Sequence, residues 1–168
     1  MRRVLDGIYA VSAALAGLFL VGVFAMVMAS IVSRAVGVYI PGTDAYAGYC
    51  MAASGFLALA PTLRRGGHIR VELFLQHLSP ARRLAWERVC GVIGCAIAGF
   101  LAWYSIRLAW QSRLFNDVSQ GADATPLWIP QIGMAAGCVI LAIALAEIVI
   151  APVLAHKPAT DEHASIVD

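Results

Sequence analysis

Residues 8–32 read IYAVSAALAGLFLVGVFAMVMASIV and contain no charged side chain. An α-helix needs about 20 predominantly apolar residues to cross the hydrocarbon core of a bilayer, so this stretch is long enough to span a membrane. Further uncharged runs occupy residues 45–63, 89–106 and 126–146. They lack the alternation of apolar and polar residues that marks a strand of a membrane β-barrel. The pattern predicts an all-α membrane protein with four transmembrane helices, at about 8–32, 45–63, 86–110 and 127–152.

The composition agrees with a membrane protein. Of the 168 residues, 61% are hydrophobic and 13% are charged, and the mean hydropathy is +0.79, unlike an ordinary soluble domain. Arg2 and Arg3 precede the first run as in a signal peptide, but the run is too long for a signal core, so we treat it as a span. We expect a four-helix transmembrane domain over residues 1–155 and a mobile cytoplasmic tail over residues 156–168.

The positive charges predict the orientation in the membrane. One side would carry Arg2, Arg3, Arg64, Arg65, Arg70, Arg82, Arg83, Arg88 and Lys157, and the other side Arg34, Arg107 and Arg113. Because cytoplasmic loops carry the excess of Lys and Arg, both termini are expected in the cytoplasm. The net charge of +2 is therefore a topology signal. No basic cluster is interleaved with aromatic residues, so nucleic-acid binding is not expected.

A short charged segment, GGHIRVELF at residues 66–74, separates the second and third spans. Its paired glycines are typical of a helix end. Apolar residues then recur at helical spacing among polar ones, as in Val71, Phe74 and Leu78. This spacing predicts a short amphipathic helix at about residues 70–78, lying at the cytoplasmic membrane interface.

Few residues could carry chemistry. The four cysteines lie within or at the edges of apolar runs and form no Cys-x-x-Cys pair, so we expect them to be packing residues. His68 and His77 lie outside the predicted spans, so neither haem nor metal binding is expected. Ser12, Ser30 and Ser54 have no identifiable base and no Gly-x-Ser-x-Gly turn. The sequence predicts neither an enzyme nor a cofactor-binding protein.

Glu147 is the acidic residue nearest to the interior of a span. It lies about 26 Å along a helix from Pro130, close to the predicted cytoplasmic boundary. Two interpretations stay open. Solvation at the interface is the one we favour, and a buried ion pair or a polar contact to a partner is the other.

Small residues at helical spacing predict close helix contacts. Gly91, Cys95 and Gly99 would share one face of the third span, and Gly133 with Gly137 would form a small surface on the fourth. Such surfaces serve contacts within a subunit and contacts between subunits. We favour packing within this chain.

Three segments together resemble a known family: Arg34 after the first span, LRRGGHIRVE at residues 63–72, and ATPLWIP at residues 124–130. In order and spacing they are similar to the small membrane subunit, or DctQ-like component, of tripartite ATP-independent periplasmic (TRAP) transporters. The similarity runs through all four spans. Asp44 stands in a region where that family commonly has a glutamate.

The resemblance implies a sodium-coupled, ATP-independent uptake system for organic acids in the bacterial inner membrane. A periplasmic solute-binding protein would deliver the acid, and a large membrane subunit would transport it. This chain would be an accessory scaffold that contacts the large subunit and membrane lipids and has no substrate site of its own. The residues expected to stabilise the fold or to contact a partner are Arg34, Arg64, Gly67, His68, Arg70, Glu72 and Pro130, with Glu147 as a further polar interface contact.

Two other classes of function compete with this interpretation. A membrane anchor for a quinone-linked or haem-linked redox enzyme is the alternative, because a small four-helix bundle suits that role. The lack of histidines in the spans counts against haem. An independent channel is disfavoured, because no span carries the polar stripe that a pore requires.

Overall fold

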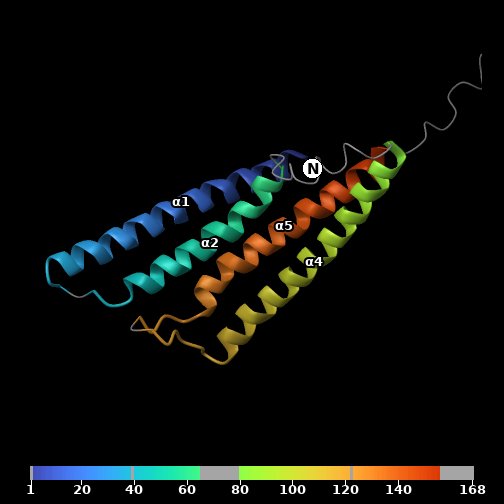
Figure 1. Ribbon diagram of the computed structural model, residues 1–168. Coiled ribbons are helices and arrows are strands. Elements are labelled where there is room, and N and C mark those ends of the chain that lie inside the picture. Colours follow the sequence, from blue (N-terminus) through green and yellow to red (C-terminus); the bar gives the residue numbers. More distant parts are fainter. Residues whose placement is uncertain (1, 39, 65–79, 122, 156–168) are drawn as a thin grey trace, which may run out of the picture.

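The computed structural model describes residues 2–38, 40–64, 80–121 and 123–155. In these ranges the chain forms helices and no strand (Figure 1). The helices are α1 (Arg2–Ala35), α2 (Thr43–Arg64), α4 (Pro80–Leu114) and α5 (Trp128–Ala155). The predicted interfacial helix at residues 70–78 and the predicted tail at residues 156–168 lie outside the described residues.

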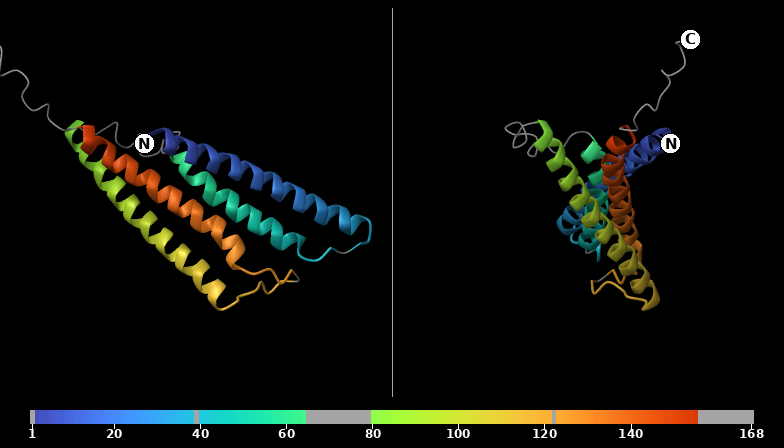
Figure 2. Two further views of the ribbon diagram at one scale, coloured as in Figure 1. Left: turned by 180° about the vertical axis from the view of Figure 1, so that it is seen from behind. Right: turned by 90° about the vertical axis from the view of Figure 1, so that its right-hand side faces the viewer.

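The four helices form an open layer in the order α1, α2, α5, α4. Helix α2 packs between α1 and α5, while α4 packs against α5 and makes no comparable contact with α1 or α2 in the described ranges. Figures 1 and 2 show the two hairpins, α1–α2 and α4–α5, side by side and inclined to each other. The chain is thus two antiparallel hairpins joined along the α2–α5 seam.

Three of the described helices are long and apolar enough to cross a membrane: Val4–Ala35, Val89–Leu114 and Trp128–Ile150. They correspond to the first, third and fourth predicted spans. Helix α2 confirms the position of the second as a helix, but it is not one of the three. Polar residues near both of its ends, such as Asp44 and Arg64, and an internal Pro61 shorten its apolar stretch.

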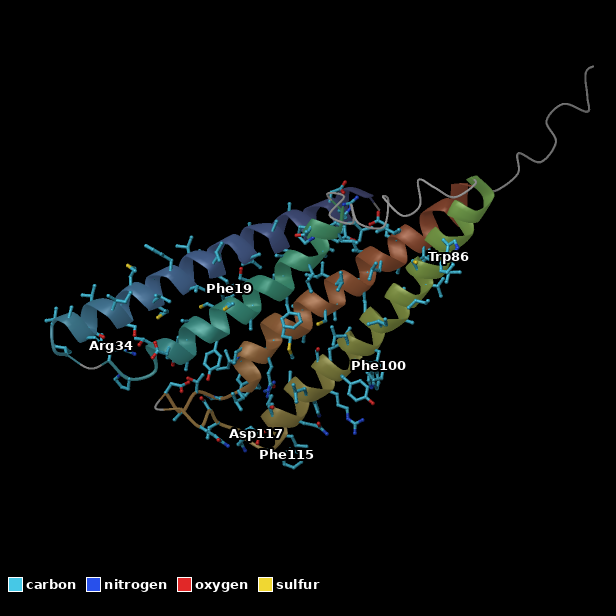
Figure 3. All side chains as sticks on the ribbon, in the orientation of Figure 1. Phe19, Arg34, Trp86, Phe100, Phe115 and Asp117 are labelled. Atoms are coloured by element: carbon cyan, nitrogen blue, oxygen red, sulfur yellow. The ribbon has the colours of Figure 1, made fainter. Side chains whose placement is uncertain are left out.

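The burial pattern is the reverse of a soluble protein. The buried apolar residues are mostly small, namely Tyr9, Ala16, Ala53, Leu57, Ala60, Ala98, Ala102, Ala135, Cys138 and Ala144. Large apolar side chains lie instead on the outer surface, including Phe24, Phe100 and Trp103. Figure 3 shows Phe100 on the side of α4 that faces away from α5. A soluble monomer does not expose so much contiguous apolar surface, whereas small residues between helices and large ones outside are typical of membrane proteins.

Helices α1 and α4 end in the same way. After α1, Gly37 has a φ of +75° and the Val38 N–H donates to the Ser33 carbonyl at 2.9 Å. After α4, Asn116 has a φ of +52° and the Asp117 N–H donates to the Ser112 carbonyl at 3.0 Å. A left-handed residue followed by this bond back into the last turn is the Schellman ending, which satisfies otherwise unpaired helix carbonyls. Both loops therefore leave their helices in defined directions.

The α2–α5 seam is built around two glycines. A Cβ atom added at Gly133 would lie 3.0 Å from the Ala53 Cβ, and one added at Gly137 would lie 2.5 Å from the carbonyl carbon and oxygen of Phe56. Gly137 therefore lies against backbone, which cannot move aside as a flexible side chain can. The small surface predicted on the fourth span packs within this chain.

Gly91 and Gly99 of α4 differ in whether another helix lies against them. A Cβ added at Gly91 would meet the Val149 Cγ2 at 3.0 Å, so this residue packs against α5. A Cβ added at Gly99 meets nothing within 4 Å. The prediction that Gly91, Cys95 and Gly99 form one packing face is therefore correct for Gly91 and wrong for Gly99. Positions eight residues apart differ by about 80° around an α-helix, and the neighbouring Ala98 is buried instead.

We expect Gly137→Ala to destabilise the isolated chain in detergent by about 1–3 kcal/mol, because the added methyl group overpacks a backbone contact. Gly99→Ala is the matched control and should be neutral or slightly stabilising, since it adds a helix-favouring methyl group in open space. Unfolding in a denaturing detergent, followed by circular dichroism, measures both. Equal stability of the two variants would contradict the seam described above.

Candidate functional site

A polar cluster ties three helices together at the end of the layer that holds the N-terminus. The Arg64 guanidinium, at the end of α2, donates to the Asp6 carboxylate of α1 at 2.5 Å. It also lies 3.9 Å from the Glu147 carboxylate of α5. The Tyr9 hydroxyl donates to the other Glu147 oxygen at 3.2 Å. We call these four residues, Asp6, Tyr9, Arg64 and Glu147, the Arg64 cluster.

The Arg64 cluster lies on a small apolar core formed by Tyr9, Ala60 and Ala144. The Tyr9 ring is 5% exposed and packs with Ala60 and Ala144. The Arg64 guanidinium lies over this ring, 4.6 Å from its centroid, which adds a cation–π attraction. The hydrogen bond to Asp6, with the nearby Glu147 charge, raises the pKa of Arg64, while partial burial acts in the opposite direction. The arginine therefore stays charged and fixed between two carboxylates.

Glu147 contacts two side chains of its own chain. Its side chain is 25% exposed, and its carboxylate lies near Tyr9 and Arg64. These contacts hold it at the end of the layer, and they do not decide between the two interpretations given above. The sequence could not indicate these contacts, because Tyr9 and Glu147 are 138 positions apart.

Serine hydroxyls hold α1 to α2. The Ser12 hydroxyl donates to the Leu57 carbonyl at 2.7 Å, and the Ser54 hydroxyl donates in the reverse direction to the Ala16 carbonyl at 2.8 Å. Hydrogen bonds between membrane helices contribute about 0.6 kcal/mol each on average. Both serines are therefore structural in this fold, and sequence analysis identified no role for them.

A second polar cluster lies at the opposite end of the layer, where the loops 36–42 and 115–127 meet. The Asp123 carboxylate accepts hydrogen bonds from the Tyr49 hydroxyl at 3.1 Å and the Ser119 hydroxyl at 3.0 Å. The Thr125 and Tyr46 hydroxyls are 3.0 Å apart. These residues, Tyr46, Tyr49, Ser119, Asp123 and Thr125, are named the Asp123 cluster. They fasten the loop that follows α4 to the start of α2.

Two backbone features fix the Asp123 cluster. Gly42 has a φ of +85°, and a Cβ added there would lie 2.8 Å from the Asp123 Cβ. Only glycine allows both this conformation and this approach. On the other side, the loop closes on itself through a single antiparallel bridge between Val118 and Pro126.

The Asp123 carboxyl is held in its charged form. Its hydrogen bond with the Thr125 hydroxyl, followed by those from Ser119 and Tyr49, lowers the pKa of Asp123, although partial burial opposes the shift. A carboxylate that accepts several hydrogen bonds resists protonation, because the bonds stabilise the charged form.

The other predicted site residues divide into two groups. Arg34 forms an exposed pair with Asp44 at 3.1 Å, with side chains 68% and 76% exposed, at the far end of α1 (Figure 3). Pro130 lies in the first turn of α5, where its missing N–H costs no helical hydrogen bond. Gly67, His68, Arg70 and Glu72 lie outside the described residues. The structure thus places Arg34 and Arg64 at opposite ends of the layer.

The wider grooves between the helices offer little for a charged substrate. A groove of about 430 Å³ between α1 and α5 is lined by apolar groups with Ser12, whose hydroxyl already bonds to Leu57. A groove of about 340 Å³ beside the Arg64 cluster is more polar, but its arginine already faces two carboxylates. In the described part of the chain, no three His, Cys, Asp or Glu residues gather to hold a metal ion.

Comparison with known proteins gives the family. The sequence profile of the DctQ component of tripartite ATP-independent periplasmic transporters matches residues 23–154. The chain belongs to the DctQ family. Searches of curated proteins and of solved structures each found no match. In TRAP systems, DctQ proteins work with a large membrane subunit and a periplasmic binding protein.

The matched region contains the whole α2–α5 seam and most of the two polar clusters. Asp6 and Tyr9 precede it, although both belong to the Arg64 cluster. The family assignment makes this chain a component of a transporter that resides in a membrane. The predicted resemblance of the chain to this family is thereby confirmed.

In this DctQ chain, we expect Tyr9→Phe to lower the free energy of unfolding by about 1 kcal/mol, because it removes the bond to Glu147 and keeps the ring. Denaturing-detergent titration measures the change. Tyr104→Phe is the matched control, since Tyr104 is 50% exposed on α4. In a double-mutant cycle, the loss from Tyr9→Phe should disappear once Glu147 is replaced by Ala. Additive losses would contradict a direct contact.

The pH dependence of the Asp123 cluster has a defined sign. Because the folded-state pKa of Asp123 is lowered, this carboxylate stabilises the loop above its ordinary pKa of 3.8. That contribution is lost as the pH falls through the lowered folded-state value. Carbon NMR of labelled aspartate should give a midpoint below 3.8 for Asp123, and Thr125→Val should raise it. Tyr104→Phe serves as the control. An unmoved midpoint in Thr125→Val would contradict the stated cause.

Proposed function

We propose that this chain is the scaffold of a sodium-coupled, ATP-independent uptake system for organic acids in the bacterial inner membrane. The large membrane subunit carries the substrate, and the periplasmic solute-binding protein delivers it. Membership of the DctQ family is the observation that carries this proposal. It also favours transport over the redox-anchor alternative.

The shape of the chain supports the scaffold role. A layer with two apolar faces gives a wide area for contact with a partner helix and with lipid. Polar clusters at both ends and a backbone contact in the middle make the layer stiff. A moving transport domain needs such a stationary element to move against. The grooves described above supply few free polar groups for an organic acid.

We further infer that α2 crosses the membrane together with the three more apolar helices. It lies between α1 and α5, so lipid reaches only part of its surface. Among the described residues, six arginines belong to helix segments at the end of the layer that holds Arg64, namely Arg2, Arg3, Arg64, Arg82, Arg83 and Arg88. That end is therefore assigned to the cytoplasm, with both termini, and the Asp123 cluster to the periplasmic side.

The segment after α2 is assigned to the contact with the large subunit. Gly67, His68, Arg70 and Glu72 belong to the sequence motif that resembles the family. Imidazole and guanidinium groups at a cytoplasmic turn can cap the helix end or bond to a neighbouring subunit. Arg34 and Pro130 are given supporting roles at the periplasmic end.

Reconstitution of the three components in proteoliposomes tests the proposal. An inward sodium gradient should drive uptake of one acid from a panel of labelled carboxylic acids, without ATP. Omission of this chain should abolish uptake and lower the yield of folded large subunit. Full uptake by the large subunit and the binding protein alone would refute the scaffold role.

Variants of this chain refine the same experiment. His68→Ala combined with Arg70→Ala should reduce complex yield or uptake severalfold. His156→Ala combined with Lys157→Ala is the matched control in the expected tail and should leave both unchanged. Normal yield and normal uptake in the first variant would reject the assigned contact while leaving the scaffold role to the omission test.

A further inference from the structure

A lateral groove lies between α4 and α5 next to the loop end of the layer. Its volume is about 300 Å³. Its lining includes Ala109, Trp110 and Arg113 of α4, and Trp128, Ile132 and Val139 of α5. Arg113 is the charged residue among them. It stands close to the end of α4, whose last residues lead to Phe115 and Asp117 in Figure 3.

The groove has a polar end and an apolar end. Arg113 and Trp128 lie beside the connecting loop, and their side chains meet with the guanidinium 5.5 Å from the ring centroid. Val139 lies about 16 Å further along α5, at 1.5 Å per residue. This distance is close to half of the roughly 30 Å hydrocarbon core, which is the depth of one leaflet. The groove therefore has the length of one lipid acyl chain in the leaflet at the loop end.

Arg113 has no carboxylate partner among the described residues. The ion pairs among the described residues involve Arg34 and Arg64. Arg113 is exposed and lies next to Trp128. Guanidinium groups bind phosphate in a two-pronged geometry. A cation at the membrane surface also attracts anionic lipid.

We propose that an anionic phospholipid binds in this groove, with its phosphate on Arg113 and one acyl chain between α4 and α5. The charge at one end, the apolar lining and the one-leaflet length all match this single occupant. The lipid would fill the open side of the α4–α5 hairpin and hold α4 in place. Among the described residues, α4 packs on α5 and makes no comparable contact with another helix. This inference does not depend on the transport role.

Tryptophan quenching by brominated lipids tests the proposal directly. Trp86, Trp103 and Trp110 are replaced by Phe, which leaves Trp128 as the fluorophore at the groove. The purified chain is placed in mixed bilayers that contain either brominated phosphatidylglycerol or brominated phosphatidylcholine at equal mole fraction. The relative association constant at Trp128 should favour phosphatidylglycerol about fivefold, as expected for one basic residue near the surface.

Three variants separate the causes. Arg113→Gln should bring the preference close to one, while Arg107→Gln should keep it, since Arg107 is on the same helix but does not line the groove. Ala109→Leu fills the groove and should weaken quenching by both lipids. An unchanged preference in Arg113→Gln, or an equal loss in Arg107→Gln, would overturn the proposal.

The same quenching of Trp128 is also measured in the complex with the large subunit. If Trp128 is quenched by lipid in the isolated chain and protected from it when the large subunit is present, a helix of that subunit occupies the groove. That result would also overturn the proposal. Retained selective quenching in the complex would support a bound lipid that persists after assembly.

Discussion

The approach of Gly137 to the Phe56 backbone is the contact on which the rest of the layer depends. It lies in the α2–α5 seam, which provides most of the helix contact between the two hairpins, because in the described ranges α1 barely reaches α5 and α4 makes no comparable contact with α2. In lipid, apolar side chains gain little by moving from lipid to protein, so helices associate through close packing and hydrogen bonds. A glycine against a backbone carbonyl gives the closest packing available. Gly133 against Ala53 extends the same seam by one turn.

With the seam in place, the polar groups can lie at the ends of the layer. The Arg64 cluster joins α1, α2 and α5 at one end, and the Asp123 cluster joins α2 to the second loop at the other. Between them, the α1–α2 contact uses serine hydroxyls and backbone carbonyls, which carry no net charge. Charged groups are costly at the bilayer centre, so this distribution at the two ends of the layer is the one that a membrane-spanning chain requires.

The sequence was sufficient for the positions of the four described helices and insufficient for their arrangement. Uncharged runs such as residues 8–32 predict helices because length and composition are local properties. Gly133 and Gly137 predict a close contact, but the spacing does not identify Phe56 as the neighbour. The Arg64 cluster could not be predicted, since Arg64 and Asp6 are 58 positions apart and meet only after the seam fixes the helices. The order of the helices in the layer could not be predicted for the same reason, because nothing local distinguishes one arrangement of four helices from another.

The segment at residues 63–72, on which the resemblance to the family partly rests, begins at the Arg64 cluster. Its first two residues therefore have contacts within this chain. Leu63 packs against the apolar core around Tyr9. Arg64 pairs with the carboxylates of Asp6 in α1 and Glu147 in α5. These two residues therefore have a role within the chain's own fold and need no partner to explain them. They also hold the end of α2 against two other helices.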